Sequence, residues 1–127
     1  MPTHKHYEFS VSVETAFVAE QSDVDQNRYV FSYTVTITNT GSMAAQLISR
    51  HWIITDATDN VQEVRGLGVV GVQPLLKPEE HFQYTSGTVL KTAVGNMRGS
   101  YQMVAEDGTQ FEAVIELFTL TMPRVLH

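Results

Sequence analysis

The feature that most constrains this chain is a two-residue alternation of side-chain character, which is clearest over residues 29–38. Aromatic or aliphatic residues occupy every odd position there, and most of the even positions carry hydroxyls. Successive side chains of a β-strand point to opposite faces, so the pattern predicts a strand with one apolar and one largely hydroxyl face. No stretch holds a 3.6-residue apolar stripe over about 11 residues, and long amphipathic helices are not expected.

Four further segments resemble strands and are separated by polar or glycine-rich turns. They cover residues 7–14, 46–55, 61–65 and 81–88, with an exposed acidic loop at 20–27 and a turn at 56–60. The segment 46–55 is apolar at odd and even positions alike, which predicts a central strand. On this reading Arg50 shares a face with Ile48, Trp52 and Ile54.

The end of the chain predicts a β-hairpin whose turn contains Asp107 and Gly108. A three-residue loop, 106–108, pairs Met103 with Phe111, whereas a two-residue loop pairs Val104 with Phe111. We expect the three-residue loop, ended by a G1 bulge at Gly108, because glycine adopts the left-handed conformation without steric cost. Two glycines, at positions 95 and 99, are expected to punctuate the approach to this hairpin.

These segments amount to about seven or eight short strands, with no long helix between them to make a parallel crossover. The expected fold class is therefore all-β, a two-sheet antiparallel sandwich of the immunoglobulin or fibronectin type III kind. A chain of 127 residues suits one domain, which buries roughly two thirds of its unfolded surface. We expect one domain over residues 1–127, with flexible ends at 1–6 and 124–127.

Charge and cysteine content argue against several classes of function. The formal net charge is -6, with eight acids and three bases up to residue 64, then six acids and five bases. No basic stripe is available to displace counterions from phosphates, so nucleic acid is not an expected partner. The lack of cysteine excludes disulfides, thiol catalysis and thiolate metal sites, and it suits a reducing compartment.

Targeting signals are not evident in the sequence. No apolar signal region follows Met1, and no apolar run approaches the ~20 residues that a membrane helix requires. We therefore expect a cytoplasmic protein with no membrane partner.

Several separated motifs resemble one protein family. Residues 49–57 read SRHWIITDA, 66–74 read GLGVVGVQP, 84–87 read YTSG and 99–103 read GSYQM. In this order they are similar to the bacterial ApaG proteins, and the resemblance covers residues 7–123.

The resemblance to ApaG proteins implies a fibronectin type III-like sandwich without established catalytic residues. It also implies a frequent genomic association with a diadenosine tetraphosphate hydrolase, and a loose link to cobalt tolerance and magnesium efflux. Related domains occur in eukaryotic F-box and polymerase-associated proteins, which favours a binding or adaptor role by analogy of fold.

The glycine-rich segment spells GxGxxG with Gly66, Gly68 and Gly71. In dinucleotide-binding folds this fingerprint needs a strand before it and a helix after it. Pro74 and Pro78 follow too closely for a useful helix, so we expect a structural loop or bulged edge strand. A nest of backbone N–H groups that binds phosphate, with Arg65 or Lys77 supplying charge, is the alternative.

Histidines and carboxylates give only a weak metal pattern. His4 and His6 have ligand-like spacing if the first residues form a strand, but no third spaced ligand accompanies them. His81 reads as a residue at a strand end, and Glu79 and Glu80 read as a solvated turn. No metal site and no cofactor are therefore predicted.

Arg50 lies on a predicted apolar face, where an unpaired buried charge is costly. Either a bulge turns it outward, or its stem covers apolar surface while the guanidinium is paired or in water and Trp52 fills the core. Alternatively, Arg50 belongs to a polar recognition surface. That candidate surface consists of Arg50, His51, Gln73, Tyr84 and Ser86.

Catalytic constellations are not apparent. Ser49 and His51 can share a strand face, but no serine sits in a strand-to-helix elbow and no acid is placed to orient a base. We therefore expect a non-enzymatic binding or adaptor domain that presents a sheet edge or a loop cluster to a protein partner, or to a second copy as a homodimer. Alternatives are nucleotide or pyrophosphate binding through residues 66–71, and divalent metal sensing.

Overall fold

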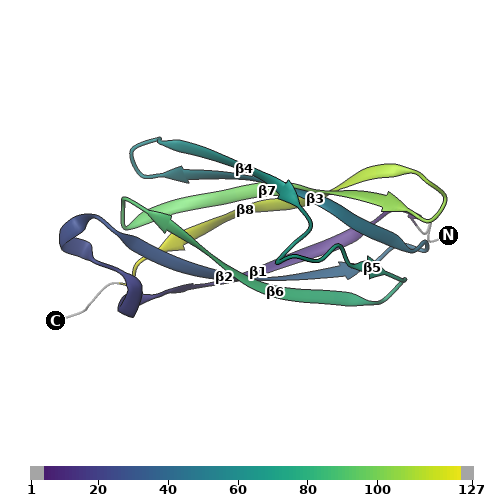
Figure 1. Cartoon of the computed structure of the whole chain (residues 1–127), viewed down its shortest axis with the longest axis horizontal. Coiled ribbons are helices and arrows are strands. Elements are labelled where there is room, and N and C mark those ends of the chain that lie inside the picture. The colour runs from purple at the N-terminus through teal and green to yellow at the C-terminus, as the bar shows by residue number, and fades with distance from the viewer. Residues whose placement is uncertain (1–4, 124–127) are drawn as a thin grey trace.

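The structure is a computed structural model, and it describes residues 5–123 (Figure 1). Its strands are β1 (Phe9–Phe17), β2 (Tyr29–Asn39), β3 (Ala45–Asp56), β4 (Val61–Leu67), β5 (Leu75–Leu76), β6 (His81–Leu90), β7 (Val94–Ala105) and β8 (Gln110–Thr121). Two short 3-10 turns, η1 (Ala19–Gln21) and η2 (Val24–Gln26), form the predicted exposed loop between β1 and β2. No helix follows Pro74, in agreement with the sequence, and strand β5, which the sequence did not predict, lies there instead.

The strands form two antiparallel sheets that pack face to face. One sheet has the order β1-β2-β6, and the other has the order β4-β3-β7-β8 with β5 also paired to β3. The chain changes sheet after β2, after β5 and after β6, as in Greek-key sandwiches. The predicted all-β, two-sheet antiparallel sandwich is confirmed, while kinship to fibronectin type III domains stays a prediction.

The alternation in residues 29–38 reflects burial as predicted. Tyr33, Val35 and Ile37 of β2 are buried between the sheets, whereas the threonines between them are only partly covered. β2 is the middle strand of its sheet and is paired with β1 and β6 along its length. Across from it, Trp52 of β3 and Tyr101 of β7 are fully buried, and their rings meet edge to face.

A β-bulge in β3 corrects the predicted faces of residues 46–55. The register against β7 shifts between Leu47 and Ser49, so Ile48 and Ser49 together oppose Gln102. Such a bulge places two successive side chains on one side of the strand. Leu47 and Trp52 are therefore both buried although one is odd and one is even. The prediction that Ile48 shares the face of Arg50 was wrong, whereas β3 is a central strand as expected.

Strand β7 runs through both glycines that the sequence pattern predicts as interruptions before the final hairpin. Gly95 and Gly99 lie inside one strand of 12 residues, and a register shift against β8 occurs between Met97 and Gly99. A Cβ on Gly99 would lie 2.0 Å from the His51 carbonyl oxygen. Glycine here permits close approach of β3, which the sequence pattern reads as a break.

The final hairpin is confirmed in register and loop length. Met103 pairs with Phe111, and the Ala105 N–H donates to the Thr109 carbonyl at 2.8 Å, which leaves a loop of three residues. Gly108 has a φ of +87°. Its left-handed conformation is the one expected at the end of such a loop.

The chain ends lie largely outside the described residues, and their expected flexibility stays a prediction. Residues 1–4 and 124–127 are not described; Lys5 and His6 are, and the Ser42 N–H donates to the Lys5 carbonyl at 3.2 Å. None of the helical turns within residues 5–123 has the length and apolar character needed to cross a membrane.

Candidate functional site

A recessed surface of the sandwich lies between the outer strands β4 and β6. Figure 1 shows these strands at the upper and lower borders of the view, with the segment after β4 crossing between the sheets. Three adjoining hollows of about 290, 430 and 260 Å³ share lining residues and form one continuous groove, called the open groove below. The side chains shared between neighbouring hollows are Tyr33, Arg50, Trp52, Ile54, Gln62, Ser86 and Val89.

Arg50 lies at the centre of the open groove and points between the sheets. Its Nη1 donates to the Leu67 carbonyl at 3.1 Å and to the Gly68 carbonyl at 2.9 Å. The guanidinium covers Gly66, where a Cβ would lie 2.8 Å from its central carbon. The bulge therefore leaves Arg50 on the inner face, and the expected alternative of a paired guanidinium is the one observed.

The charge of Arg50 is not neutralised within the chain. Among residues 5–123, no carboxylate oxygen lies within 4.0 Å of its guanidinium nitrogens, because the ion pairs there involve Lys5, His51 and Arg65. Two carbonyls satisfy donors of the guanidinium but carry no net charge. Arg50 is partly buried, so an anion in the groove would meet a cation that is only partly screened by water.

Two buried tyrosines lie beside Arg50. The hydroxyls of Tyr84 in β6 and Tyr101 in β7 are 2.5 Å apart and link the two sheets. Burial raises the pKa of Tyr84 to about 12, against a smaller opposing effect of the hydrogen bond to Tyr101. Burial is also the main cause that raises the pKa of Tyr101. Both phenols are neutral hydrogen-bonding groups at neutral pH.

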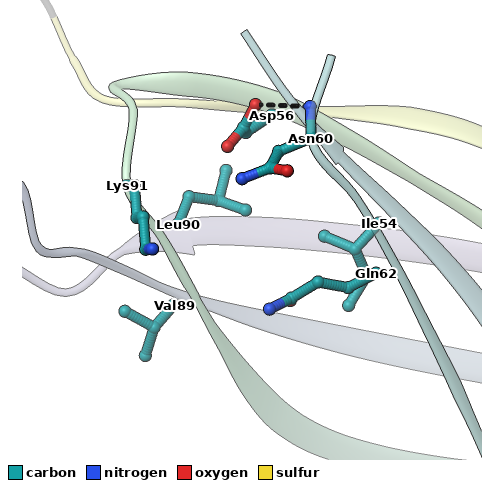
Figure 2. A pocket seen from close by; sticks show the side chains of 7 residues that line it. All are labelled: Ile54, Asp56, Asn60, Gln62, Val89, Leu90 and Lys91. Atoms are coloured by element: carbon teal, nitrogen blue, oxygen red, sulfur yellow. Dashed lines mark hydrogen bonds between the residues drawn. The ribbon is translucent and has the colours of Figure 1, made fainter. Parts of the chain in front are cut away.

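The end of the open groove near the β3–β4 turn is lined by a carboxylate, amide side chains and a lysine as well as by aliphatic side chains (Figure 2). Asp56 accepts hydrogen bonds from the Asn60 N–H at 3.0 Å and the Thr58 hydroxyl at 2.8 Å. The Thr58 hydroxyl is the largest cause that lowers the pKa of the Asp56 carboxyl. Val89 and Lys91 border the same hollow from the β6 side. The sequence marked residues 56–60 only as a turn, because nothing along the chain shows that β6 lies opposite.

The structure divides the recognition surface predicted from the sequence. Arg50, Tyr84 and Ser86 line the same hollow. His51 lies on the outer face of the five-stranded sheet. Its buried Nε2 has no hydrogen-bond partner in the part of the chain that the structure describes, and it lies 3.9 Å from Glu63 Oε1. The Gln73 side chain donates to the Ile48 carbonyl at 2.9 Å and supports the backbone there. The hypothesis that all five residues form one surface is therefore not supported by their positions.

Each glycine of the GxGxxG segment has a structural role. Gly66 leaves room for the Arg50 guanidinium, and a Cβ on Gly68 would lie 2.3 Å from the Val72 carbonyl oxygen. Val70 and Gly71 have φ values of +42° and +82°, and Val69 and Val72 exchange backbone hydrogen bonds around them. This geometry is a two-residue turn of the type that takes positive φ at both central positions.

Phosphate binding by this segment would need free N–H groups. The N–H groups of Gly68, Val69 and Val72 donate to the carbonyls of Ile48, Val72 and Val69. These three amides are not available to a phosphate nest, which needs successive free N–H groups.

The metal and nucleophile hypotheses find little geometric support among residues 5–123. No group of three His, Asp or Glu residues there is placed to hold a metal ion, and His4 lies outside the described residues. Glu80 accepts the Lys77 N–H at 2.7 Å, as turn residues do. The Ser49 hydroxyl donates to Gln102 Oε1 at 2.7 Å rather than to His51.

The comparisons with known proteins decide the family. The ApaG domain matches residues 19–105 of this chain. The chain belongs to the ApaG family. It is 71% identical over 127 residues to Protein ApaG of Methylobacillus flagellatus, covering all of both chains. It is 65% identical over 127 residues to Protein ApaG of Thiobacillus denitrificans, again at full length. The resemblance inferred from the sequence motifs is thereby confirmed.

Solved structures of other proteins share the fold. A crystal structure of the ApaA protein from Bordetella pertussis is 60% identical, with a TM-score of 0.93, and covers 97% of this chain and 100% of that chain. A protein from Archaeoglobus fulgidus is similar at 13% identity with a TM-score of 0.51, covering 91% of this chain and 100% of that chain. That second likeness concerns the fold alone.

Proposed function

We propose that this protein is a non-enzymatic binding module that takes an extended segment of a partner protein into the open groove. The segment presents a carboxylate to Arg50 and apolar side chains to the groove borders. Surfaces of this kind, with a charged group set among apolar and aromatic side chains, are typical of peptide recognition. A binding role without catalysis agrees with the adaptor function that the ApaG resemblance implies.

One observation carries this proposal: the open groove has a partly buried cation at its centre and unpaired apolar side chains along its border. Exposed large apolar residues cluster on the segments that border the groove, which distinguishes them from singly scattered surface residues. They are Val64, Val70 and Val89, which line the hollows of the groove. A partner that covers them gains apolar burial, and Arg50 supplies orientation.

The test compares two arginine variants as bait in cell extract. Arg50→Ala is expected to lose the specific partners that the wild-type chain retains, whereas Arg98→Ala on the exposed surface of β7 keeps them. Equal retention by all three baits, or loss of unfolding stability in Arg50→Ala without loss of any partner, contradicts the proposal. A titration with acetate gives a second readout, since the Arg50 side-chain N–H signals should shift.

The nucleotide alternative remains a separate prediction. Titration of isotope-labelled protein with ATP or pyrophosphate should move the amide signals of residues 66–71 if this segment binds phosphate. Three N–H groups of this segment already donate to carbonyls of the chain, so we expect these amide signals not to move. Unchanged signals at millimolar ligand would remove this function.

A role in divalent metal handling, with the loose link to cobalt and magnesium, is a separate proposal. Calorimetry with Co²⁺ on a chain that starts at Tyr7 distinguishes a metal site in the sandwich from chelation by His4 and His6. We expect no binding to the shortened chain. We also expect the protein to act in the cytoplasm, because its cysteine-free sequence suits a reducing compartment.

A further inference from the structure

The outer edge of β4 carries unpaired backbone groups. Among residues 5–123, β4 pairs with β3 alone, and two hydrogen bonds show which residues of β4 face β3. The Asp56 N–H donates to the Asn60 carbonyl at 3.0 Å, and the Gly68 N–H donates to the Ile48 carbonyl at 2.8 Å. Because bonded and non-bonded pairs alternate along an antiparallel ladder, the even-numbered residues of β4 bond to β3. The N–H and C=O groups of Val61, Glu63, Arg65 and Leu67 therefore point to the free edge.

The side chains of these odd-numbered residues lie on the outer face of the sheet and are exposed. Glu63 and Arg65 are 55% and 71% exposed, and Val61 and Leu67 are 58% and 76% exposed. The Glu63 carboxylate is 3.9 Å from His51 Nε2 and 4.0 Å from Arg65 Nη2. Both distances exceed a hydrogen bond, so these are long ion pairs between exposed groups, and they leave hydrogen-bonding positions of both charged groups open to a second copy.

The order of residues in β4 is self-complementary about Val64. In an antiparallel pair of two β4 strands with Val64 opposite Val64, Glu63 of each copy faces Arg65 of the other. Val61 of each copy then faces Leu67 of the other. Opposite charges and apolar side chains are favourable as directly facing cross-strand pairs. In this antiparallel arrangement the charged and apolar side chains of the strand VQEVRGL are therefore complementary to those of the same strand in a second copy.

Backbone geometry selects the same register. Outward-pointing groups must face outward-pointing groups, so odd-numbered residues must pair with odd-numbered ones. The next allowed registers place Glu63 opposite Glu63, or Arg65 opposite Arg65, and like charges directly opposite destabilise a sheet. The Leu67 carbonyl already accepts from Arg50, but a carbonyl has a second lone pair. Only the register centred on Val64 satisfies both the backbone and the charges.

We propose that two copies of this chain associate through β4 about a two-fold axis at Val64, which joins their larger sheets into one continuous sheet. This association is independent of the partner proposed for the open groove. Because the outer faces of both copies lie on the same side, the two open grooves lie together on the other side. They face each other across the paired β4 strands, and the composite trough contains Arg50 from each copy.

Sedimentation velocity tests the association on the full chain. The wild type is expected to shift from 14.2 kDa to twice that mass across a series from about 1 to about 500 µM, a range that covers weak to moderate affinity. Glu63→Arg places like charges opposite each other at both symmetric positions, so its dissociation constant should rise about tenfold or more. Arg65→Glu should act in the same way.

The charge-exchanged double variant Glu63→Arg/Arg65→Glu provides the decisive comparison. It restores opposite charges across the two-fold axis, so its affinity should return to within about threefold of the wild type. Glu116→Arg on β8, an exposed position, controls for the change in net charge and should not affect association. A wild type that stays monomeric throughout the series overturns the proposal, and so does an association that the single variants leave unchanged or the double variant fails to restore.

Amide hydrogen exchange locates the contact and separates this proposal from the groove function. The N–H groups of Glu63 and Arg65 should become protected as concentration rises, while those of Gln62 and Val64 are protected at all concentrations. Arg50→Ala should leave this protection unchanged even where it abolishes partner binding. Protection that appears on β6 or β1 instead of β4 would overturn the inference.

Discussion

The two long sides of the sandwich are bounded by different chemistry. On one side β1 and β8 are in contact, and the Tyr7 and Phe9 rings both pack on Phe111 with centroid separations of 5.5 and 6.1 Å. On the other side the open groove separates β4 from β6. The Arg50 guanidinium lies there, whereas aromatic rings lie between the sheets on the closed side. Aromatic side chains fill the gap on one side, whereas Arg50 supports the backbone on the other and leaves it hollow.

This difference follows from the number of strands in each sheet. The smaller sheet has three strands, whereas the larger has four side by side, with β5 next to β3 on the same side as β4. When the edge strands of the two sheets meet on one long side, the larger sheet therefore extends beyond the smaller one on the other side. The overhanging strand is β4. A closed side buries apolar surface and contributes stability, and an overhanging edge is left available for binding.

The largest expected effect concerns the segment that borders the open groove. Gly68→Ala and Gly71→Ala both place a Cβ on a backbone with positive φ, but the new Cβ meets the Val72 carbonyl at 2.3 Å in the first case and nothing within 4 Å in the second. Gly71→Ala should lower the free energy of unfolding by about 1–2 kcal/mol, and Gly68→Ala by about 3 kcal/mol or more. Urea denaturation measures both, and equal losses would show that this border is not tightly constrained.

The second prediction concerns the hydroxyl pair that joins the two sheets near the groove. Tyr84→Phe leaves the Tyr101 hydroxyl buried without its partner, so the free energy of unfolding should fall by about 1–3 kcal/mol. The pKa of Tyr84 is raised to about 12, so the folded state favours the neutral phenol. Its contribution is complete below the ordinary pKa of about 10 and is lost as pH rises toward 12.

Alkaline titration of the phenolate absorbance checks the same pair. Of the five tyrosines, Tyr84 and Tyr101 should ionise only together with unfolding, followed by far-ultraviolet circular dichroism. Complete ionisation of all tyrosines in a protein that remains folded would show that these two hydroxyls are not shielded by the sandwich.

A smaller effect is expected from the fit between Arg50 and Gly66. Gly66→Ala displaces the guanidinium from the Leu67 and Gly68 carbonyls, which should lower the free energy of unfolding by about 1 kcal/mol. In an Arg50→Ala background the same change should cost nothing, because the atoms that it meets are gone. The coupling energy from this double-mutant cycle is the measurement, and additive losses would contradict the contact.

The smallest expected effect is on stability in acid, and it compares the Asp107 carboxylate on the closed side with the Asp56 carboxylate on the open side. The Tyr7 hydroxyl is the largest cause that lowers the pKa of Asp107 at the closed side, and the Thr58 hydroxyl is the largest for Asp56 at the open side. A lowered pKa gives stability that is present above the unfolded value of about 3.9 and is lost as pH falls below it. Unfolding of Tyr7→Phe and Thr58→Ala at several pH values should each show a weaker acid loss than the wild type. A steeper loss in either variant would contradict the assigned cause.

Much of the fold could be predicted because local patterns in this sequence agree with it. The alternation in β2 comes from its middle position between two strands, and Gly108 indicates the hairpin loop because few residues other than glycine adopt its conformation readily. The candidate site was harder to predict. Arg50, Tyr84 and Ser86 meet only because β3 and β6 lie in opposite sheets, and no spacing along the chain encodes that proximity.

The errors have one physical origin, which is the irregularity of long strands. A single extra residue at Ile48 changes which positions face the core, and the alternation rule has no way to detect it. Gly99 lies within β7 because the β3 backbone passes too close for a side chain. Such contacts between segments distant in sequence are invisible to a reading of one segment at a time.

The sequence by itself determined most of the strands, the final hairpin and the family, because each depends on residues that are neighbours along the chain or on motifs read in order. Tertiary structure decided that Arg50 faces inward over Gly66, that one long side is closed and the other open, and that the edge of β4 is free. These features depend on how two sheets of unequal width stack, and that is a property of the whole assembly of strands rather than of any one of them.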